Sequence, residues 1–300
     1  MKIRADGLLG LHGSVLLFAL AGIIGKMLAL APCVLVAGRC AFAAATLFIF
    51  IMLRGRLHQL FFSRAIVVSG AVLAVHWLTF FQAIDYAGVG VALVSYSTYP
   101  LALLLIEWGW YRITPSAMRA LTGGLILVGM VLLVPELNFN NNTVVGATWG
   151  IGSGVLFAIY TLANRGLAEG KEPIAIACCQ NVVSALCMLP FAAWVTATMD
   201  QHFGWRDLAL LAFLGGVCTG LAHTWFIASL ARVGVGTASL VASLEAVHGV
   251  ALAWILLGEI PALRTVVGGI IILSAVMLGT RMAVQFVSIN ERMKAKDSLM

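Results

Sequence analysis

The sequence predicts an all-α membrane protein in which ten transmembrane helices form two five-helix repeats of inverted topology. Three observations support this prediction: an apolar composition, long runs without charge, and short motifs that recur at a nearly constant offset. Apolar residues make up 62% of the 300-residue chain and charged residues only 10%, whereas a soluble domain carries about 25% charged residues. A water-soluble fold cannot bury so much apolar surface, so the lipid bilayer is an expected partner of the chain.

The apolar residues are concentrated in runs that match the roughly 20 residues needed to cross a bilayer. The first run is too long for the apolar part of a signal peptide and lacks a small-residue cleavage site, so we expect it to remain as a helix. The six cysteines lie in apolar segments without the spacing of a zinc site or a disulfide framework, which predicts free thiols. The ten expected helices span residues 8–30, 33–53, 65–85, 88–110, 117–134, 146–167, 173–197, 207–230, 236–257 and 263–284.

The lysines and arginines are distributed unevenly between alternate loops. If the N-terminus lies inside the cell, most of the 18 basic residues fall on the cytoplasmic side, and only Arg206 and Arg264 fall outside. Cytoplasmic loops of membrane proteins collect Lys and Arg, so both termini are expected to be cytoplasmic and the membrane to be the inner or plasma membrane. The net charge of +6 then reflects a basic face against anionic lipid. Nucleic acid is not an expected partner.

Short motifs of the first half recur in the second half. An offset of 146 residues places Ser97 on Ser243, and an offset of 141 places Arg39 on Gln180. Because five helices is an odd number, the second half must enter the membrane in the opposite orientation. The expected divisions are a first repeat over 1–137, a loop over 138–144, a second repeat over 145–285 and a cytoplasmic tail over 286–300. Further matches pair Gly88-Val89-Gly90 with Gly234-Val235-Gly236, Trp108 with Trp254, Gly123-Gly124 with Gly268-Gly269, and Pro32 with Pro173.

The ninth expected helix carries Ser243-Leu244-Glu245-Ala246-Val247, followed by Ala253-Trp254-Ile255-Leu256-Leu257-Gly258-Glu259. This pair of motifs resembles the helix-nine signature of EamA-type members of the drug/metabolite transporter superfamily, and the resemblance covers about residues 8–284. The chain departs from the family pattern at Ala246, where a proline is usual, and at Ile113-Thr114, where Gly-Glu would fall. The resemblance implies a carrier of metabolites or drugs, usually an exporter, without naming the substrate.

Charged side chains at membrane depth are costly and therefore point to function. Glu245 lies near the midplane, about 12 Å from the cytoplasmic end of its helix. His248 follows on the same helix face, and the two residues are candidates for cation binding or proton coupling, the alternative being a buried structural pair. Arg39 in the second helix suits a carboxylate or phosphate ligand. Its alternative role is an internal ion pair, for example with Glu245.

Other polar and aromatic residues at membrane depth are candidates for lining a substrate cavity. Each of them has packing or an interhelical hydrogen bond as its alternative role. Tyr99 is the repeat counterpart of Glu245. Three acidic residues near helix ends, Asp85, Glu107 and Glu259, are expected to be solvated or structural. The cavity candidates are His76, Trp77, Gln82, Tyr96, Tyr99, Tyr160, Asn164, Asn181, His223, Trp225 and Ser243.

From the resemblance and the opposed charges of Arg39 and Glu245, we expect a transporter that exports an amino acid or a related small amphipathic metabolite by alternating access. An organic cation of the choline type, or a drug, is the alternative substrate because Trp and Tyr faces bind ammonium groups. An intramembrane enzyme is the alternative of a different class. It would need a nucleophile with its base or a metal cluster, such as His76 and His223 converging on one metal. No such motif is evident, so neither a metal nor a cofactor is expected.

Overall fold

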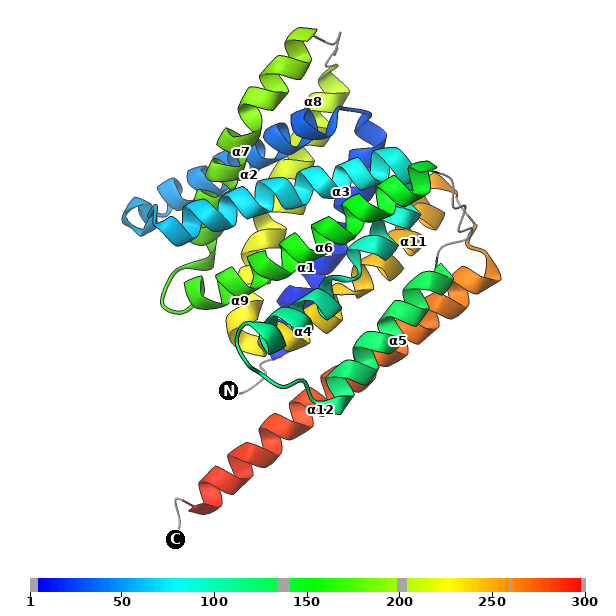
Figure 1. The fold of residues 1–300 in the computed structure, drawn as a ribbon. Coiled ribbons are helices and arrows are strands. Elements are labelled where there is room, and N and C mark those ends of the chain that lie inside the picture. The colour runs from blue at the N-terminus through cyan, green and yellow to red at the C-terminus, as the bar shows by residue number, and fades with distance from the viewer. Residues whose placement is uncertain (1–4, 134–140, 199–203, 259, 298–300) are drawn as a thin grey trace.

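A computed structural model describes residues 5–133, 141–198, 204–258 and 260–297, and every regular element within these ranges is a helix (Figure 1). Eight helical segments among these residues are long and apolar enough to cross a membrane, and α4 and α5 are two shorter apolar helices. This confirms a helical, multi-pass architecture. The elements are α1 (Ala5–Leu28), α2 (Pro32–Leu53), η1 (Leu57–Gln59), α3 (Arg64–Tyr96), α4 (Tyr99–Gly109), α5 (Ala117–Leu133), α6 (Asn141–Leu167), α7 (Pro173–Thr198), α8 (Trp205–Gly215), η2 (Gly216–Leu221), α9 (Ala222–Val233), α10 (Val235–Ala242), α11 (Leu244–Leu257) and α12 (Leu263–Asp297).

Local sequence signals set several helix ends. Pro32 opens α2, where its missing N–H costs no helical hydrogen bond. The Ser63 hydroxyl caps α3 by accepting from the backbone N–H of Ile66 at 3.3 Å. Gly258 ends α11 in the left-handed conformation that glycine adopts at low cost. Between these ends, helices satisfy their own backbone hydrogen bonds, which a lipid environment requires.

Two helices that the sequence predicts as continuous are interrupted. The expected helix 88–110 is divided between the end of α3 and α4, and the expected helix 236–257 is divided at Ser243 into α10 and α11. The Ser97 hydroxyl donates to the backbone oxygen of Leu93 at 2.7 Å, and the Ser243 hydroxyl donates to that of Ser239 at 3.2 Å. Such side-chain bonds to the preceding turn often bend helices. At the first break, Pro100 in the first turn of α4 also prevents the helix from continuing.

The expected helices 65–85 and 207–230 also differ from the structure. α3 continues through Gly88, whose φ of 79° and ψ of 170° form a kink inside the helix. The eighth expected helix contains the π-helical segment η2 between α8 and α9. π-Helical turns widen a helix locally and often occur at functional sites. The last helix, α12, continues to Asp297, past its expected end at 284.

Unusual backbone conformations recur at the offsets found in the sequence. Gly88 and Gly234, 146 residues apart, both have a φ of 79°. Arg112 and Gly258, also 146 residues apart, have φ values of 56° and 70°. At the offset of 141, Ala29 and Gly170 have φ values of 48° and 81°. Corresponding positions of the two halves therefore share backbone geometry as well as sequence.

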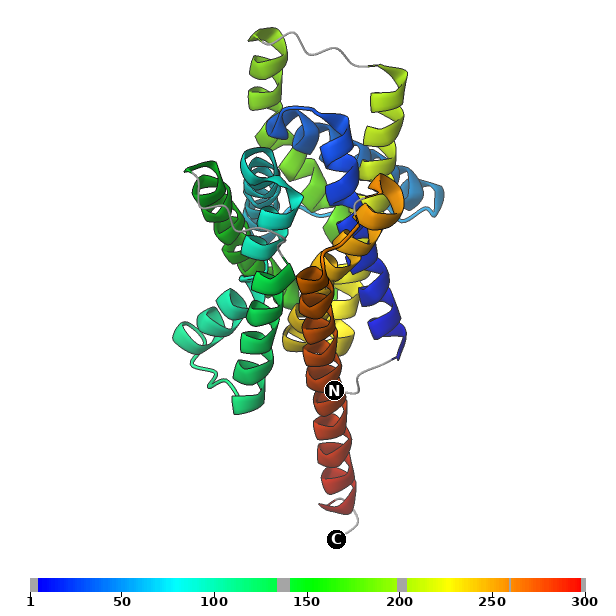
Figure 2. The same ribbon diagram turned by 90° about the vertical axis from the view of Figure 1, so that its right-hand side faces the viewer.

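Helices from the first half pack against helices from the second half. α3 lies along α6, α2 along α7, and α1 along α9 (Figure 1). α5 and α12 lie side by side and extend away from the other helices, as both views show (Figures 1 and 2). Glycines allow the closest approaches: a Cβ atom at Gly154 of α6 would lie 2.6 Å from the backbone oxygen of Tyr96. The core therefore forms between the two halves.

Candidate functional site

Arg39 of α2 lies at the centre of the helical bundle and is fully buried. Its Nε donates to the hydroxyl of Thr219 in η2 at 2.9 Å. Its guanidinium carbon lies 3.6 Å from the centre of the Trp77 ring, a cation–π contact. Both terminal nitrogens, Nη1 and Nη2, are buried and have no hydrogen-bond partner in the described parts of the chain. The direct ion pair with Glu245 that the sequence leaves open is therefore not formed, and Arg39 presents donors suited to a carboxylate.

Glu245 of α11 is buried in a tightly packed aromatic pocket. Tyr96 of α3 lines the same pocket and interacts with its carboxylate. The ring of Tyr96 stacks on that of Tyr99, the repeat counterpart of Glu245, with the ring centres 6.2 Å apart. The pocket is divided into gaps narrower than a water molecule, so the carboxylate is occluded in this conformation. The pocket is lined by Phe18, His76, Trp77, Phe80, Tyr96, Phe157 and Glu245.

Trp77 is shared by the surroundings of the two charged groups, because it contacts Arg39 and also lines the Glu245 pocket. His76 and His223 flank its ring, with ring centres 4.9 and 5.7 Å away. The Nδ1 atom of His76 is 2.9 Å from the hydroxyl of Ser153 on α6. The pocket therefore contains side chains from α1, α3, α6 and α11, which come from both halves of the chain.

A buried hydrogen-bond network lies beside Arg39. The Tyr160 hydroxyl is 3.0 Å from both the amide oxygen of Gln180 and Nδ1 of His223. The amide nitrogen of Gln180 donates to Ser69 at 2.7 Å and to Asn164 at 3.1 Å. All five side chains are buried. Three of the expected cavity residues, Tyr160, Asn164 and His223, thus belong to one network.

Five expected site residues lie outside this cluster. Trp225 is 39% exposed and packs over Gly13 of α1. Gln82 is only partly buried and does not line the pocket. Of the other three, Asn181 donates to the backbone of Ala177 and Ser243 to that of Ser239. His248 is only partly buried and does not line the pocket.

A sequence profile of the EamA-like transporter family matches residues 6–134 and again residues 144–281. The chain belongs to this family. An uncharacterized transporter of Synechocystis, sll1319, is 21% identical over 196 residues, and the match covers 63% of this chain and 58% of that protein. A solved crystal structure with 17% identity has a TM-score of 0.77 and covers 94% of this chain and 99% of its own, which shows the same fold. Both family and relative are described as transporters, not enzymes.

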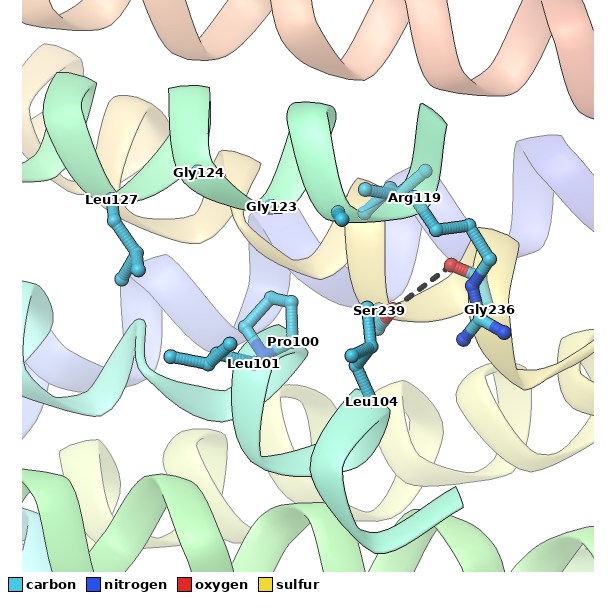
Figure 3. A pocket seen from close by; sticks show the side chains of 11 residues that line it. Pro100, Leu101, Leu104, Arg119, Gly123, Gly124, Leu127, Gly236 and Ser239 are labelled. Carbon is cyan, nitrogen blue, oxygen red and sulfur yellow. Dashed lines mark hydrogen bonds between the residues drawn. The ribbon is translucent and has the colours of Figure 1, made fainter. Parts of the chain in front are cut away.

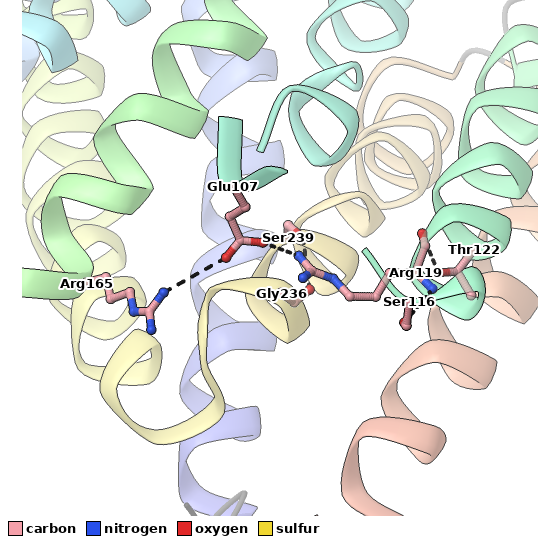
Figure 4. A network of polar contacts seen from close by, with 7 residues as sticks. All are labelled: Glu107, Ser116, Arg119, Thr122, Arg165, Gly236 and Ser239. Atoms are coloured by element: carbon pink, nitrogen blue, oxygen red, sulfur yellow. Dashed lines mark hydrogen bonds and ion pairs between the residues drawn. The ribbon is translucent and has the colours of Figure 1, made fainter. Parts of the chain in front are cut away.

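This EamA-family transporter has a second polar site at the ends of its helices. Glu107 of α4, expected near a helix end as a solvated or structural residue, is buried between two arginines (Figure 4). Arg119 of α5 donates to its carboxylate at 2.5 Å, and Arg165 of α6 lies 4.0 Å away. The guanidinium of Arg119 also lies over Gly236 of α10, where a Cβ atom would be 3.3 Å from it. We call these four residues the Glu107 clamp, because they join both halves.

A cleft of about 140 Å³ lies beside the clamp, between α4, α5 and α10 (Figure 3). Its walls are mainly apolar, with Pro100 and Leu101 on the α4 side and Gly123, Gly124 and Leu127 on the α5 side. The Ser239 hydroxyl faces it while donating to the backbone oxygen of Gly236 at 2.9 Å. The cleft is therefore a lateral opening next to the clamp rather than the central pocket.

Several polar residues of these sites escaped the sequence analysis as site residues. Gln180 entered only as the repeat counterpart of Arg39, although a buried amide in an apolar helix is itself a signal. Thr219 lies in the apolar run Gly216–Leu221, where nothing in the sequence marks the π-helical turn. Within the described parts of the chain, no group of three His, Cys, Asp or Glu lies close enough together to hold a metal ion.

Proposed function

We propose that this EamA-family transporter exports a small zwitterionic metabolite, such as an amino acid, across the inner or plasma membrane. The observation that supports this substrate class is that the Arg39 guanidinium, whose terminal nitrogens have no partner among the described residues, and the occluded Glu245 carboxylate both lie near Trp77. A substrate carboxylate would bind the planar fork of Arg39, and a substrate ammonium would bind Glu245. Each buried charge then gains a partner of opposite sign.

The proposed transport mechanism is alternating access between two inverted five-helix halves, 1–137 and 145–285, with both termini in the cytoplasm. The recurrence of backbone geometry at Gly88 and Gly234 supports the duplication. An odd number of helices per half requires the inversion. The central pocket receives side chains from both halves, so a rocking motion of one half against the other would open it.

The Glu107 clamp would close the cytoplasmic end of this pathway, since the predicted topology places all four of its residues there. Its acid has no counterpart in the second half, where Ala253 occupies the position 146 residues later. A buried carboxylate between two guanidinium groups holds the helices of both halves together only while it stays ionised and paired. The clamp must therefore break whenever the site opens to the cytoplasm.

An organic cation of the choline type is the second candidate substrate. The aromatic lining around Glu245 supports it, because Phe18, Trp77 and Tyr96 present rings to the carboxylate pocket. Ammonium groups bind favourably over such rings beside an acid. This alternative leaves the terminal nitrogens of Arg39 unused, and for that reason we favour the zwitterion. Protons are a candidate coupling ion, with Glu245 and His248 as the groups to carry them.

A ligand screen tests the proposal. The purified transporter would be heated with amino acids, quaternary amines, sugars and drugs, and the thermal unfolding midpoint measured for each compound. We expect amino acids to raise the midpoint, because a ligand that binds only the folded state stabilises it by mass action. The effect should disappear in Arg39→Gln but remain in Arg64→Gln, which removes an exposed arginine at the start of α3. Stabilisation by quaternary amines or sugars alone would refute the zwitterionic substrate.

A further inference from the structure

The hydrogen-bond network beside Arg39 can be followed donor by donor. It starts at Asn164, whose amide nitrogen donates to the backbone oxygen of Tyr160 at 2.9 Å. The amide oxygen of Asn164 must then face Gln180. It accepts a hydrogen bond from the amide nitrogen of Gln180 at 3.1 Å. That nitrogen also donates to Ser69 at 2.7 Å. Both amide protons of Gln180 are therefore used, and its amide oxygen faces Tyr160.

The same accounting continues through Tyr160 to His223. The Tyr160 hydroxyl donates its one proton to the Gln180 amide oxygen at 3.0 Å. Its oxygen also lies 3.0 Å from Nδ1 of His223. Since the hydroxyl proton is already used, the proton of this second hydrogen bond must come from Nδ1 of His223. A neutral imidazole carries one N–H, so its Nε2 holds only a lone pair.

We propose that His223 is a specificity-determining residue whose Nε2 accepts a hydrogen bond from an N–H or O–H group of the transported molecule. Nε2 is buried and has no hydrogen-bond partner among the residues that the structure describes. A buried acceptor without a donor is costly, and buried polar groups are normally paired. Tyr160 and Gln180 act as positioning residues, because they decide which imidazole nitrogen carries the proton. This inference deepens the proposed function and rests on it.

The position of His223 relates it to the same substrate site. Its ring centre lies 5.7 Å from that of Trp77 and 5.2 Å from that of Phe18, and both of these rings line the Glu245 pocket. Arg39 also contacts the Trp77 ring, and its two terminal nitrogens are donors without an acceptor among the described residues. The site therefore combines two donors that lack an acceptor, the terminal nitrogens of Arg39, with one acceptor that lacks a donor, Nε2 of His223. A zwitterion with a primary ammonium meets both needs, whereas a quaternary ammonium has no N–H to offer His223.

The first test is spectroscopic and does not depend on transport. Nitrogen-15 NMR of protein labelled at histidine separates protonated from unprotonated imidazole nitrogens, and the signals lost in His223→Gln identify His223. We expect Nδ1 to carry the proton in the wild type. Tyr160→Phe should release this preference, whereas Tyr99→Phe should not, because the Tyr99 hydroxyl bonds to Thr161, at 3.4 Å, and not to His223. A proton on Nε2 of wild-type His223 would overturn the inference.

The second test compares two probes in proteoliposomes: leucine and its N,N,N-trimethyl derivative. We expect the wild type to prefer leucine by about tenfold or more, the effect of one hydrogen bond to a charged group. His223→Gln should keep this preference through its amide oxygen, and His223→Phe should lose it. An unchanged preference in His223→Phe would overturn the inference. Transport of neither probe would contradict the proposed function instead, and the NMR result would then decide the tautomer by itself.

Discussion

A guanidinium at membrane depth is costly, about 2.5–3.5 kcal/mol at the helix centre on scales from membrane-insertion experiments. Arg39 offsets part of this cost through its hydrogen bond to Thr219 and its contact with the Trp77 ring. These contacts use Nε and the face of the guanidinium plane but leave both terminal nitrogens without partners. The protein thus holds the charge in a fixed orientation while reserving its forked edge, which suits recognition of a planar anion.

Replacing Arg39 by lysine tests this role at the residue scale. Lysine keeps the charge but loses the planar fork and the Nε bond, so substrate affinity should fall by about tenfold or more, given about 1.5–3 kcal/mol for a hydrogen bond to a charged group. Isothermal titration with the best ligand of the screen measures the change. Arg64→Lys, a control at an exposed position, should bind as the wild type does. Equal affinity in Arg39→Lys would show that the fork makes no substrate contact.

The helix ends carry the features that a moving transporter needs. Breaks at Ser97 and Ser243 divide helices that would otherwise be continuous, and Gly88 and Gly234 occupy a backbone region that is essentially reserved for glycine. Beside them, the Glu107 clamp joins α4 and α5 to α6 and α10. A pathway closed by a few charges can open when those charges separate.

Glu107→Gln tests the clamp at the level of these elements. The substitution removes the charge that both arginines contact, so the closed state should lose about 1.5–3 kcal/mol and open at least about tenfold more often. A cysteine introduced at Ser239, which is buried beside the clamp, should then react about tenfold faster with a membrane-impermeant maleimide from the cytoplasmic side. The same protein without Ser239→Cys is labelled in parallel, and its rate gives the background from the native cysteines.

Glu172→Gln is the matched control for the clamp. It removes an acid from a half-exposed pair with Arg56 at 4.0 Å, and exposed pairs contribute little. Labelling of the introduced cysteine should therefore stay at the wild-type rate in this variant. If Glu107→Gln also left the rate unchanged, the clamp would be a structural ion pair without a role in access.

At the scale of the whole molecule, the apolar runs were sufficient to predict a helical, multi-pass protein, because bilayer thickness fixes the length of a crossing helix. The motifs around Glu245 correctly indicated the family. The break at Ser243 could not be predicted, since this serine lies within an apolar run of helical length, whereas Pro100 in the first turn of α4 marks the break near Ser97 in the sequence itself. The role of Glu107 was not predicted, because its position near a helix end suggested a solvent-exposed side chain. In the structure, Arg119 of α5 and Arg165 of α6 pair with its carboxylate.

The candidate site was predicted only in part, for a geometric reason. Residues two apart on a helix point in different directions, so grouping Trp225 with His223 joined a partly exposed residue to a buried one. Conversely, Gln180, Tyr160 and Ser69 lie far apart in sequence and meet only because α3, α6 and α7 pack together. Sequence spacing along one helix carries no information about such contacts.

The most direct test of the proposed substrate site uses the Glu245→Gln variant in proteoliposomes. The exchange of labelled leucine across the membrane is measured over a range of pH. Glutamine has nearly the same shape but cannot ionise, so it can neither pair with a substrate ammonium nor carry a proton. We expect a folded variant, with the thermal midpoint of the wild type, whose exchange is lost or no longer depends on pH. Exchange with unchanged rate, selectivity and pH dependence would mean that Glu245 is structural and that substrate binds elsewhere.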